Sequence, residues 1–290
     1  MKPPPFEYHA PDSVDEALAL LAQHGDEAKV LAGGQSLIPV LNFRLARPSV
    51  IVDLNRIGVL AGIDAANGGL RIGAMTRQRE AERSAAIAQR TPLLAEALGW
   101  VAHPQIRTRG TIGGSLAHAD PAAELPAVML ALDARFRLRR GTAERVVAAR
   151  DFFTGLFMTT LAVDELLVGI DIPEAEPRGG SAFLEVARRH GDFALVGIAV
   201  TLVLDDRGTC RDARLAYVNA GPGPYRSARA EAAVQGQRLT PGMLRAAADA
   251  AVAEARPASD VHASADYRRQ LVRVLTERAL ARAFERAAAA

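Results

Sequence analysis

Short apolar runs and segments of helical spacing alternate along the first third of the chain. Lys29–Ala32 and Ser49–Leu54 have the length and composition of buried strands, and Ser36–Arg44 between them has apolar residues at helical spacing. Ser13 followed by Glu16 is a capping-box pattern, which predicts the start of a helix. This alternation predicts mixed α and β structure and argues against a helical bundle or a β-sandwich.

The middle of the chain continues the mixture. Asn67-Gly68-Gly69 predicts a turn before a strand over Leu70–Ala74, and Pro92–Ala102 predicts a helix that His103-Pro104 ends. A further helix is expected from Asp120-Pro121, with proline at its first position. Two more strands are predicted, over Ala134–Arg139 and Leu166–Ile172.

The pattern changes after Pro173–Gly180, the best candidate for a linker. Consecutive strands are predicted over Ala182–Arg188, Phe193–Leu204 and Arg211–Asn219, and helices from Ala228 to a last one over Ser264–Ala290. Strands followed by helices predict a small α+β domain.

Composition narrows the function classes. The 290 residues, about half of them apolar, can form a large core, and a net charge of +2 gives no broad positive field for nucleic acid. No apolar run reaches the roughly 18 residues of a membrane span, and residues 1–10 lack a signal-peptide core, so we expect a soluble, cytoplasmic protein. The single cysteine, Cys210, cannot ligate an iron–sulfur cluster alone. An iron–sulfur cluster that exchanges electrons with this protein must therefore be bound by another chain.

Two glycine pairs carry the candidate chemistry. Ala32–Ser36 and Thr111–Ser115 each hold Gly-Gly beside a hydroxyl residue, and each is expected to be a turn. Glycine lets backbone N–H groups converge on a phosphate without interference from a Cβ, so two such turns could hold a pyrophosphate. Ordinary tight turns are the alternative for each pair. Neither is a Rossmann G-x-G-x-x-G or a P-loop, which disfavours a nicotinamide-binding Rossmann domain and an ATPase.

Longer motifs carry a more specific signal. They are Lys29–Ser36 (KVLAGGQS), Ile72–Thr76 (IGAMT), Gln105–Ser115 (QIRTRGTIGGS), Asp120–Pro126 (DPAAELP) and Arg188–Ala194 (RRHGDFA). With these motifs the chain resembles a known family, the FAD-binding medium subunits of the xanthine dehydrogenase and carbon monoxide dehydrogenase group of molybdenum hydroxylases. The motifs occur in the family's order and spacing, and the resemblance covers nearly the whole chain.

The resemblance implies an α+β fold of the vanillyl-alcohol oxidase and cell-wall-reductase type. Two α+β subdomains, roughly residues 1–57 and 58–175, would enclose FAD, and residues 176–290 would form a small C-terminal α+β domain. It also implies partners: a large molybdopterin subunit and a small 2Fe-2S subunit, assembled as a dimer of heterotrimers.

The resemblance further implies which residues bind FAD, with the two glycine segments on the pyrophosphate. Glu124 would contact the ribose, for which a solvated helix carboxylate is the alternative. Val101, Leu167 and Phe193 would surround the isoalloxazine, for which core packing is the alternative. The full expected set is Leu31, Ala32, Gly33, Gly34, Gln35, Ser36, Leu37, Val101, Thr111, Ile112, Gly113, Gly114, Ser115, Glu124, Leu167 and Phe193.

Two positions depart from relatives within this family. Leu184 stands where the fused xanthine dehydrogenases are expected to have lysine, and Gln35 replaces a histidine of some carbon monoxide dehydrogenases, so a carbon monoxide substrate is not assigned.

Other polar residues give weaker signals. The histidines 103, 118 and 190 lack the spacing of a zinc site and are expected in turns or on the surface. The arginines at 135, 137, 139 and 140 are expected on one solvated strand face, with contact to an acidic partner as the alternative.

The sequence therefore predicts an FAD-dependent oxidoreductase subunit that accepts electrons from 2Fe-2S clusters and passes them to an external acceptor. No residue of the chain is expected to act as a base toward the organic substrate. One alternative is an assembly scaffold that binds the nucleotide but has lost redox function. Another is a self-contained FAD oxidase, for which the sequence offers no acid–base residue.

Overall fold

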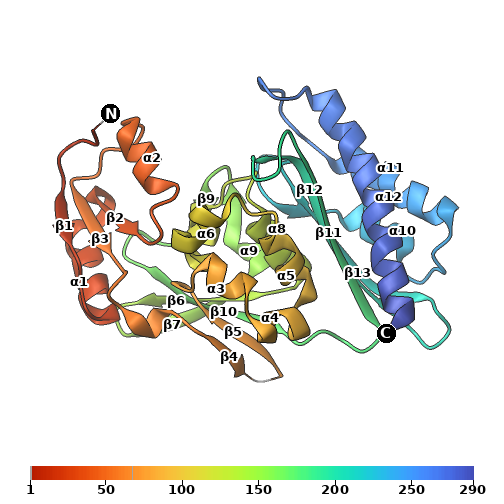
Figure 1. The fold of residues 1–290 in the computed structure, drawn as a ribbon, viewed down its shortest axis with the longest axis horizontal. Helices are drawn as coiled ribbons and strands as arrows, with labels where there is room; N and C mark the ends of the chain where they lie inside the picture. The colour runs from red at the N-terminus through yellow and green to blue at the C-terminus, as the bar shows by residue number, and fades with distance from the viewer. Residues whose placement is uncertain (1, 67) are drawn as a thin grey trace.

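The computed structural model describes residues 2–66 and 68–290, and Asn67 of the predicted turn lies outside them. Three units follow one another along the long axis of the molecule, each built on its own sheet (Figure 1). The N-terminal unit is at one end, the C-terminal unit is at the other, and the second unit lies between them. This arrangement matches the predicted α+β class.

The N-terminal unit is a small parallel sheet with one helix packed against it. Its strands are β1 (Glu7–His9), β3 (Val50–Asp53) and β2 (Ala28–Leu31), in that order, with α1 (Val14–His24), η1 (Gly25–Glu27) and α2 (Leu37–Asn42) as connections. The Ser13 hydroxyl accepts a hydrogen bond from the Glu16 N–H at 3.2 Å, which confirms the predicted helix start. Residues 32–36 therefore connect strand β2 to helix α2, as predicted.

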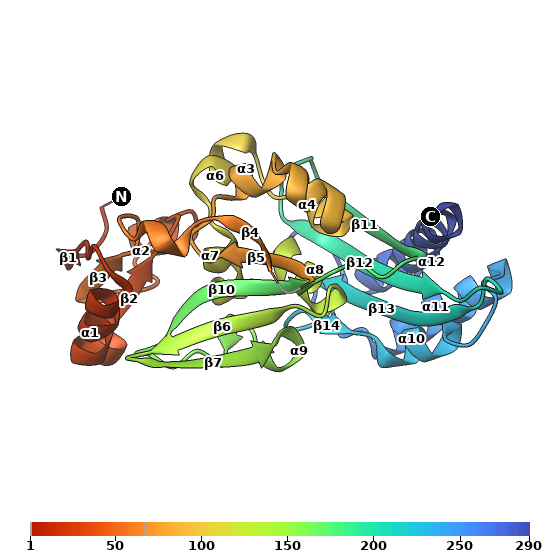
Figure 2. The same ribbon diagram turned by 90° about the horizontal axis from the view of Figure 1, so that it is seen from below.

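The middle unit is a five-stranded antiparallel sheet with helices packed on one face (Figure 2). The strand order is β4 (Ile63–Ala66), β5 (Gly69–Gly73), β10 (Leu166–Pro173), β6 (Arg135–Arg140) and β7 (Ala143–Ala148). The helices are η2 (Gly58–Leu60), α3 (Gln78–Glu82), α4 (Ala85–Arg90), α5 (Pro92–Leu98), α6 (Pro104–Arg109), α7 (Ile112–His118), α8 (Glu124–Ala131) and α9 (Ala149–Phe152), and a hairpin pairs β8 (Phe153–Gly155) with β9 (Met158–Thr159).

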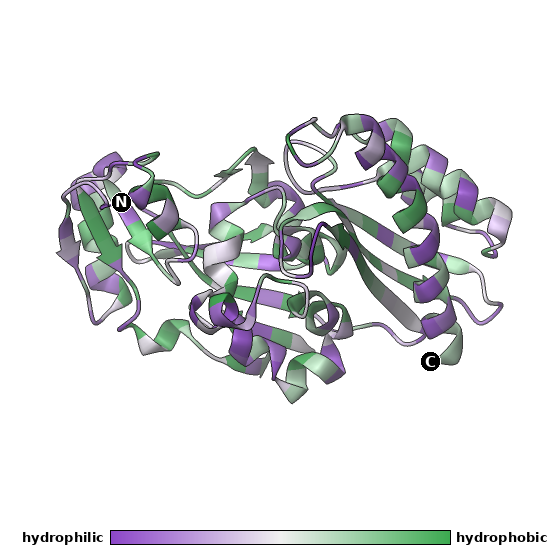
Figure 3. Cartoon of the chain, turned by 45° about the horizontal axis from the view of Figure 1, so that its top comes forward, coloured by the Kyte–Doolittle hydropathy of each residue, from purple (hydrophilic) through white to green (hydrophobic). Residues whose placement is uncertain are grey.

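The C-terminal unit is an antiparallel sheet between two layers of helices. Its strands are β11 (Gly179–Ala187), β12 (Ala194–Leu204), β13 (Cys210–Val218) and β14 (Tyr225–Arg226), and its helices are α10 (Ala228–Val234), α11 (Pro241–Glu254) and α12 (Ala265–Ala289). Strand β12 is buried almost throughout because α12 packs on one face of the sheet and α5 and α8 on the other. The outer helices carry a mixture of polar and apolar residues (Figure 3).

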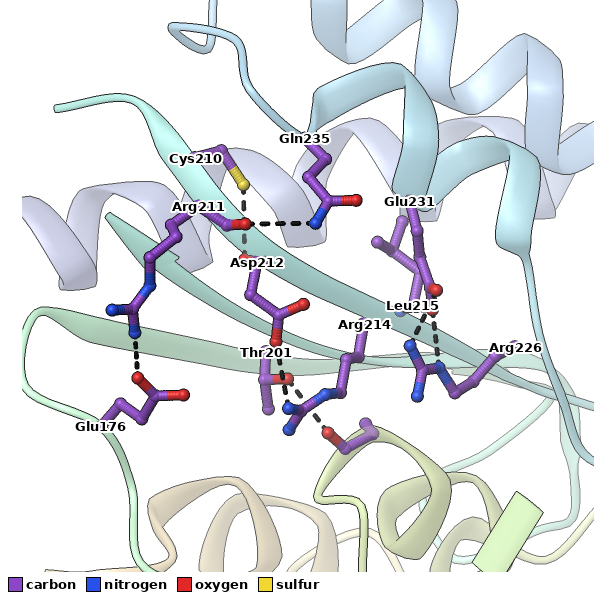
Figure 4. Close-up of polar contacts among 11 residues, drawn as sticks. Glu176, Thr201, Cys210, Arg211, Asp212, Arg214, Leu215, Arg226, Glu231 and Gln235 are labelled. Carbon is purple, nitrogen blue, oxygen red and sulfur yellow. Dashed lines mark hydrogen bonds and ion pairs between the residues drawn. The ribbon is translucent and has the colours of Figure 1, made fainter. Parts of the chain in front are cut away.

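Polar contacts join the C-terminal unit to the middle unit. The Thr201 hydroxyl donates to the Ala131 carbonyl at 3.0 Å, which satisfies a carbonyl at the end of α8. Within the C-terminal unit, Arg226 donates twice to Glu231 at 2.8 Å, so that β14 is held to α10 (Figure 4). Between the two units, Glu96 of α5 also accepts a hydrogen bond from Arg286 of α12 at 2.7 Å.

Several predicted elements differ from the structure. Helix α8 begins at Glu124 rather than at Asp120-Pro121, because the Asp120 side chain accepts from the Ala122 N–H at 2.9 Å and forms a turn instead. The helix expected to reach Ala102 ends at Leu98, followed by Gly99 as its C-cap. The short strands β1, β8, β9 and β14 were not predicted, since runs of two or three residues carry no periodicity. The longer strands β4 and β7 were also not predicted.

Arg135, Arg137 and Arg139 of β6 lie on one face, as expected, with Phe136 and Leu138 buried on the other. The expectation is wrong for Arg140, which follows Arg139 directly and so points to the opposite face of the strand. Three of these arginines form ion pairs within the chain: Arg137 with Asp171 at 2.8 Å, Arg140 with Asp164 at 2.7 Å, and Arg139 with Asp15.

Candidate functional site

One large cavity is bordered by residues of all three units. Its volume is about 1340 Å³, above the roughly 300–1,000 Å³ common for drug-sized ligands. The connection between β2 and α2 lies on one wall, and α7 and the start of α8 lie on another. The loop between β11 and β12 borders it from the C-terminal unit. The cavity can therefore hold an elongated ligand.

The first glycine segment forms a backbone cradle. Gly34 has φ of +73°, a conformation that favours glycine. Gln35 Nε2 donates to the Gly33 carbonyl at 3.1 Å and Asn55 Nδ2 donates to the Ala32 carbonyl at 2.9 Å, so the carbonyls are held in place. Among the described residues, the N–H groups of 33–36 have no hydrogen-bond acceptor. They are free to bind an anion.

The second glycine segment is the first turn of helix α7, so the expectation of a turn at Thr111–Ser115 is wrong. Its N–H groups already have acceptors: Ile112 donates to Thr76 at 3.0 Å, and Gly113 to Ala74 at 2.8 Å. Thr111 caps the helix by accepting from the Gly114 N–H at 3.0 Å. This segment therefore contributes a side-chain-free surface and the Ser115 hydroxyl, not a second set of free amides.

The two segments lie against each other. A Cβ on Gly33 would lie 2.8 Å from Gly110 Cα, and also against the Arg109 carbonyl oxygen. A Cβ on Gly114 would lie 3.3 Å from Ala32 Cβ. Only glycine permits this approach, so the structure brings together the two segments that the sequence singled out.

Glu124 is a buried carboxyl on the cavity wall, so the solvated-carboxylate alternative is wrong. It is the first residue of α8 and is 6% exposed. Burial, with the nearby Asp120, raises its pKa to about 7. Glu185 on β11 is also buried, and its burial next to Glu124 raises its pKa to about 9.

The three predicted flavin neighbours all border the cavity. Val101 and Leu167 also belong to the buried core of the middle unit, so each side chain both packs in this core and lines the cavity. Phe193 is 71% exposed, which core packing does not explain. The side chain of Leu184 packs against the core of the C-terminal unit.

The remaining predicted residues divide into two groups. Gln35, Ser36 and Leu37 border the cavity with the glycines. Leu31 and Ile112 do not: Leu31 ends strand β2, and Ile112 is fully buried in the core.

Sequence reasoning missed several residues of the cavity wall. Phe157, at the tip of the hairpin between β8 and β9, lies with its ring 5.1 Å from that of His118. His262 and Arg268 border the cavity from the C-terminal unit, and so does Arg188, the first residue of the motif Arg188–Ala194, to which no contact was assigned. No local pattern identifies Phe157, His262 or Arg268, because their positions at the cavity depend on how the units pack.

His103 and His190 are exposed and lie outside helices and strands, as expected, whereas His118 is half-buried at the end of α7. Within residues 2–66 and 68–290, no group of three or more His, Cys, Asp or Glu side chains is arranged to hold a metal ion. In the same part of the chain, no helix combines the length and apolarity needed to cross a membrane.

The donor set fits a flavin dinucleotide. Unpaired amides suit a diphosphate, a buried carboxyl suits sugar hydroxyls, and apolar side chains suit an aromatic ring system. The cavity has the size to contain all three parts of such a ligand.

Family comparisons agree with this chemistry. The family described as "FAD binding domain in molybdopterin dehydrogenase" matches residues 4–175, and the "CO dehydrogenase flavoprotein C-terminal domain" matches residues 181–283. The chain belongs to this family, and it is an FAD-dependent oxidoreductase subunit of the medium-subunit type found in molybdenum hydroxylases. The predicted family, fold class and FAD cofactor are confirmed.

Relatives and solved structures match along the whole chain. The 6-hydroxypseudooxynicotine dehydrogenase complex subunit alpha of Paenarthrobacter nicotinovorans is 46% identical over 99% of this chain and 97% of the relative. The carbon monoxide dehydrogenase medium chain of Hydrogenophaga pseudoflava is 41% identical over 99% and 100%. The structure of carbon monoxide dehydrogenase from Hydrogenophaga pseudoflava superposes with a TM-score of 0.96 at 43% identity, covering 99% of each chain.

Proposed function

We propose that this chain is the electron-transfer flavoprotein of a three-subunit molybdenum hydroxylase. It receives electrons from the 2Fe-2S clusters of a small subunit and delivers them to an external acceptor. A large subunit carries molybdopterin and oxidises the substrate, and the complex is a cytoplasmic dimer of heterotrimers. When bound, FAD supplies the exchange between one-electron and two-electron carriers.

The observation that carries this proposal is the contact between the two glycine segments on the cavity wall. The free N–H groups of residues 33–36 would bind the pyrophosphate, because oriented amides can share its negative charge without a lysine. The side-chain-free start of α7 would let the phosphates approach closely, and the Ser115 hydroxyl would add a donor.

The remaining contacts assign the other parts of FAD. Glu124 would accept hydrogen bonds from the ribose hydroxyls, since a carboxylate is a strong acceptor in a buried site. Val101, Leu167 and Phe193 would pack around the isoalloxazine. Leu31 and Ile112 would act indirectly, by fixing the ends of the two segments that bind the phosphates. The domain division near residues 175 and 176 belongs to the same proposal.

The substrate of the complex is not assigned. Relatives with 39–46% identity carry names that refer to nicotine derivatives, carbon monoxide and caffeine. Such variety among similar medium subunits supports a substrate pocket on another chain.

The redox role can be tested against the scaffold alternative. The purified chain is loaded with FAD, reduced with dithionite, and mixed with acceptors of different classes: a nicotinamide, a quinone, a cytochrome and dioxygen. An electron-transfer subunit would reoxidise repeatedly with at least one of them. A scaffold would bind the nucleotide without turnover, and oxidation of small alcohols by the isolated chain would favour a self-contained oxidase.

A further inference from the structure

Arg107 is a buried arginine whose guanidinium makes four hydrogen bonds within the chain. It is 5% exposed. Nε and Nη2 donate to the two carboxylate oxygens of Glu82 at 3.0 and 3.1 Å. Nη1 donates to the carbonyls of Val101 at 2.7 Å and Ala102 at 2.9 Å. The planar fork of an arginine suits this set of acceptors, whereas the single ammonium of a lysine could not reach all four.

The two carbonyls belong to a corner of the backbone, residues 100–103, between helices α5 and α6. Ala102 there has φ of +42°, a left-handed conformation that is unfavourable for alanine. Such a conformation persists where the surrounding structure holds it. Arg107 does so from both sides of Ala102, because it donates to the carbonyl of Val101, which precedes Ala102, and to the carbonyl of Ala102 itself. Val101 of this corner borders the cavity.

The outer side of the corner supports the loop of residues 188–193 between β11 and β12. Gly191 lies against the imidazole of His103, where a Cβ would be 2.5 Å from Nδ1. The Trp100 ring stacks on His190, with centroids 5.5 Å apart and planes 29° apart. The same loop carries Phe193 to the cavity. The corner thus borders the cavity and also contacts the 188–193 loop, which borders the same cavity from the C-terminal unit.

We propose that Arg107 is a positioning residue for the flavin: by holding the carbonyls of Val101 and Ala102, it fixes the corner beside the ring and the seat of the 188–193 loop. This inference rests on the proposed function, because Val101 and Phe193 are the proposed flavin neighbours. A purely structural Glu82–Arg107 pair would stabilise the fold without affecting the flavin environment.

Trp100 makes the corner directly observable, since it is the only tryptophan in the chain. The test compares the wild type, Arg107→Lys and Arg79→Gln. Arg79 is the matched control: it donates to the same Glu82 at 2.7 Å, and within residues 2–66 and 68–290 it makes no hydrogen bond to the corner. Acrylamide quenching of Trp100 is measured in the FAD-free protein. After FAD is added, visible circular dichroism and the rate of flavin reduction by the reduced 2Fe-2S small subunit are measured.

Arg107→Lys is expected to raise the Trp100 quenching constant about twofold, because the corner opens locally. It should also change the visible dichroism of bound FAD and slow flavin reduction by about tenfold or more, since a displacement of about 1 Å can cost about 10²-fold in rate. Arg79→Gln should match the wild type in all three signals.

A folded Arg107→Lys with wild-type quenching and dichroism would overturn the inference. If that variant does not fold, Glu82→Ala decides: removal of the carboxylate should loosen Arg107 and raise quenching above that of Arg79→Gln, and equal quenching overturns the inference. A wild-type chain that binds no FAD would instead refute the proposed function, and the quenching of the FAD-free protein would still report on the corner.

Discussion

Replacing Gly33 with alanine tests the contact between the two glycine segments. The new Cβ would lie 2.8 Å from Gly110 Cα and also against the Arg109 carbonyl oxygen. These are backbone atoms that cannot rotate away, so the segments must separate. Overpacking of this kind costs typically about 1–3 kcal/mol. If the strain is relieved in the FAD-free protein and restored on binding, FAD affinity falls by about 5- to 150-fold.

Titration of the FAD-free protein with FAD, followed by flavin fluorescence, measures this loss. Gly58→Ala is the matched control, because a Cβ there meets no atom within 4 Å. Thermal unfolding of both variants shows whether the strain instead appears as lost stability. Wild-type affinity together with wild-type stability in Gly33→Ala would refute the close approach of the segments and the pyrophosphate site built on it.

Three further predictions concern buried groups. With Glu124 at a pKa of about 7, FAD affinity should rise with pH through about 7 in the wild type as the acceptor carboxylate forms, and titrations of Glu124→Gln should lose this dependence. Because the pKa of Glu185 is raised, the folded chain keeps a proton that the unfolded chain releases, so stability falls as pH rises from 4.5 to about 9. Calorimetry of Glu185→Gln over this pH range should show a smaller fall in stability. Thr201→Val leaves the Ala131 carbonyl without its donor and should lower the free energy of unfolding in urea by about 1–3 kcal/mol, with an unchanged value arguing against this link.

The regular elements of the fold were largely predictable from periodicity. Strands such as β3 and β12 are long or strongly apolar, and the capping residue Ser13 marks α1 without tertiary information. The start of α8 was mistaken because Asp120-Pro121 suits both a turn and a helix start. Which one forms depends on the Asp120 side chain accepting from the Ala122 N–H.

The candidate site was predictable where its function lies in the backbone. The glycine pairs signal a need for space, and the structure shows why: Gly33 approaches Gly110, and Gly113 approaches Ala74. Sequence could not show that the amides of 112 and 113 have acceptors already, because the carbonyls of Thr76 and Ala74 reach them from the segment just after β5. It also could not place Phe157, whose role follows from the packing of a hairpin against α7.

Electron transfer between this chain and a cluster-bearing partner is the central claim. The FAD-loaded chain is mixed in a stopped-flow instrument with a reduced 2Fe-2S small subunit from the same complex, and flavin absorbance is followed. The account predicts that the flavin is bleached while the clusters are reoxidised in matching electron equivalents. A flavin that stays oxidised in a complex containing both subunits would contradict it.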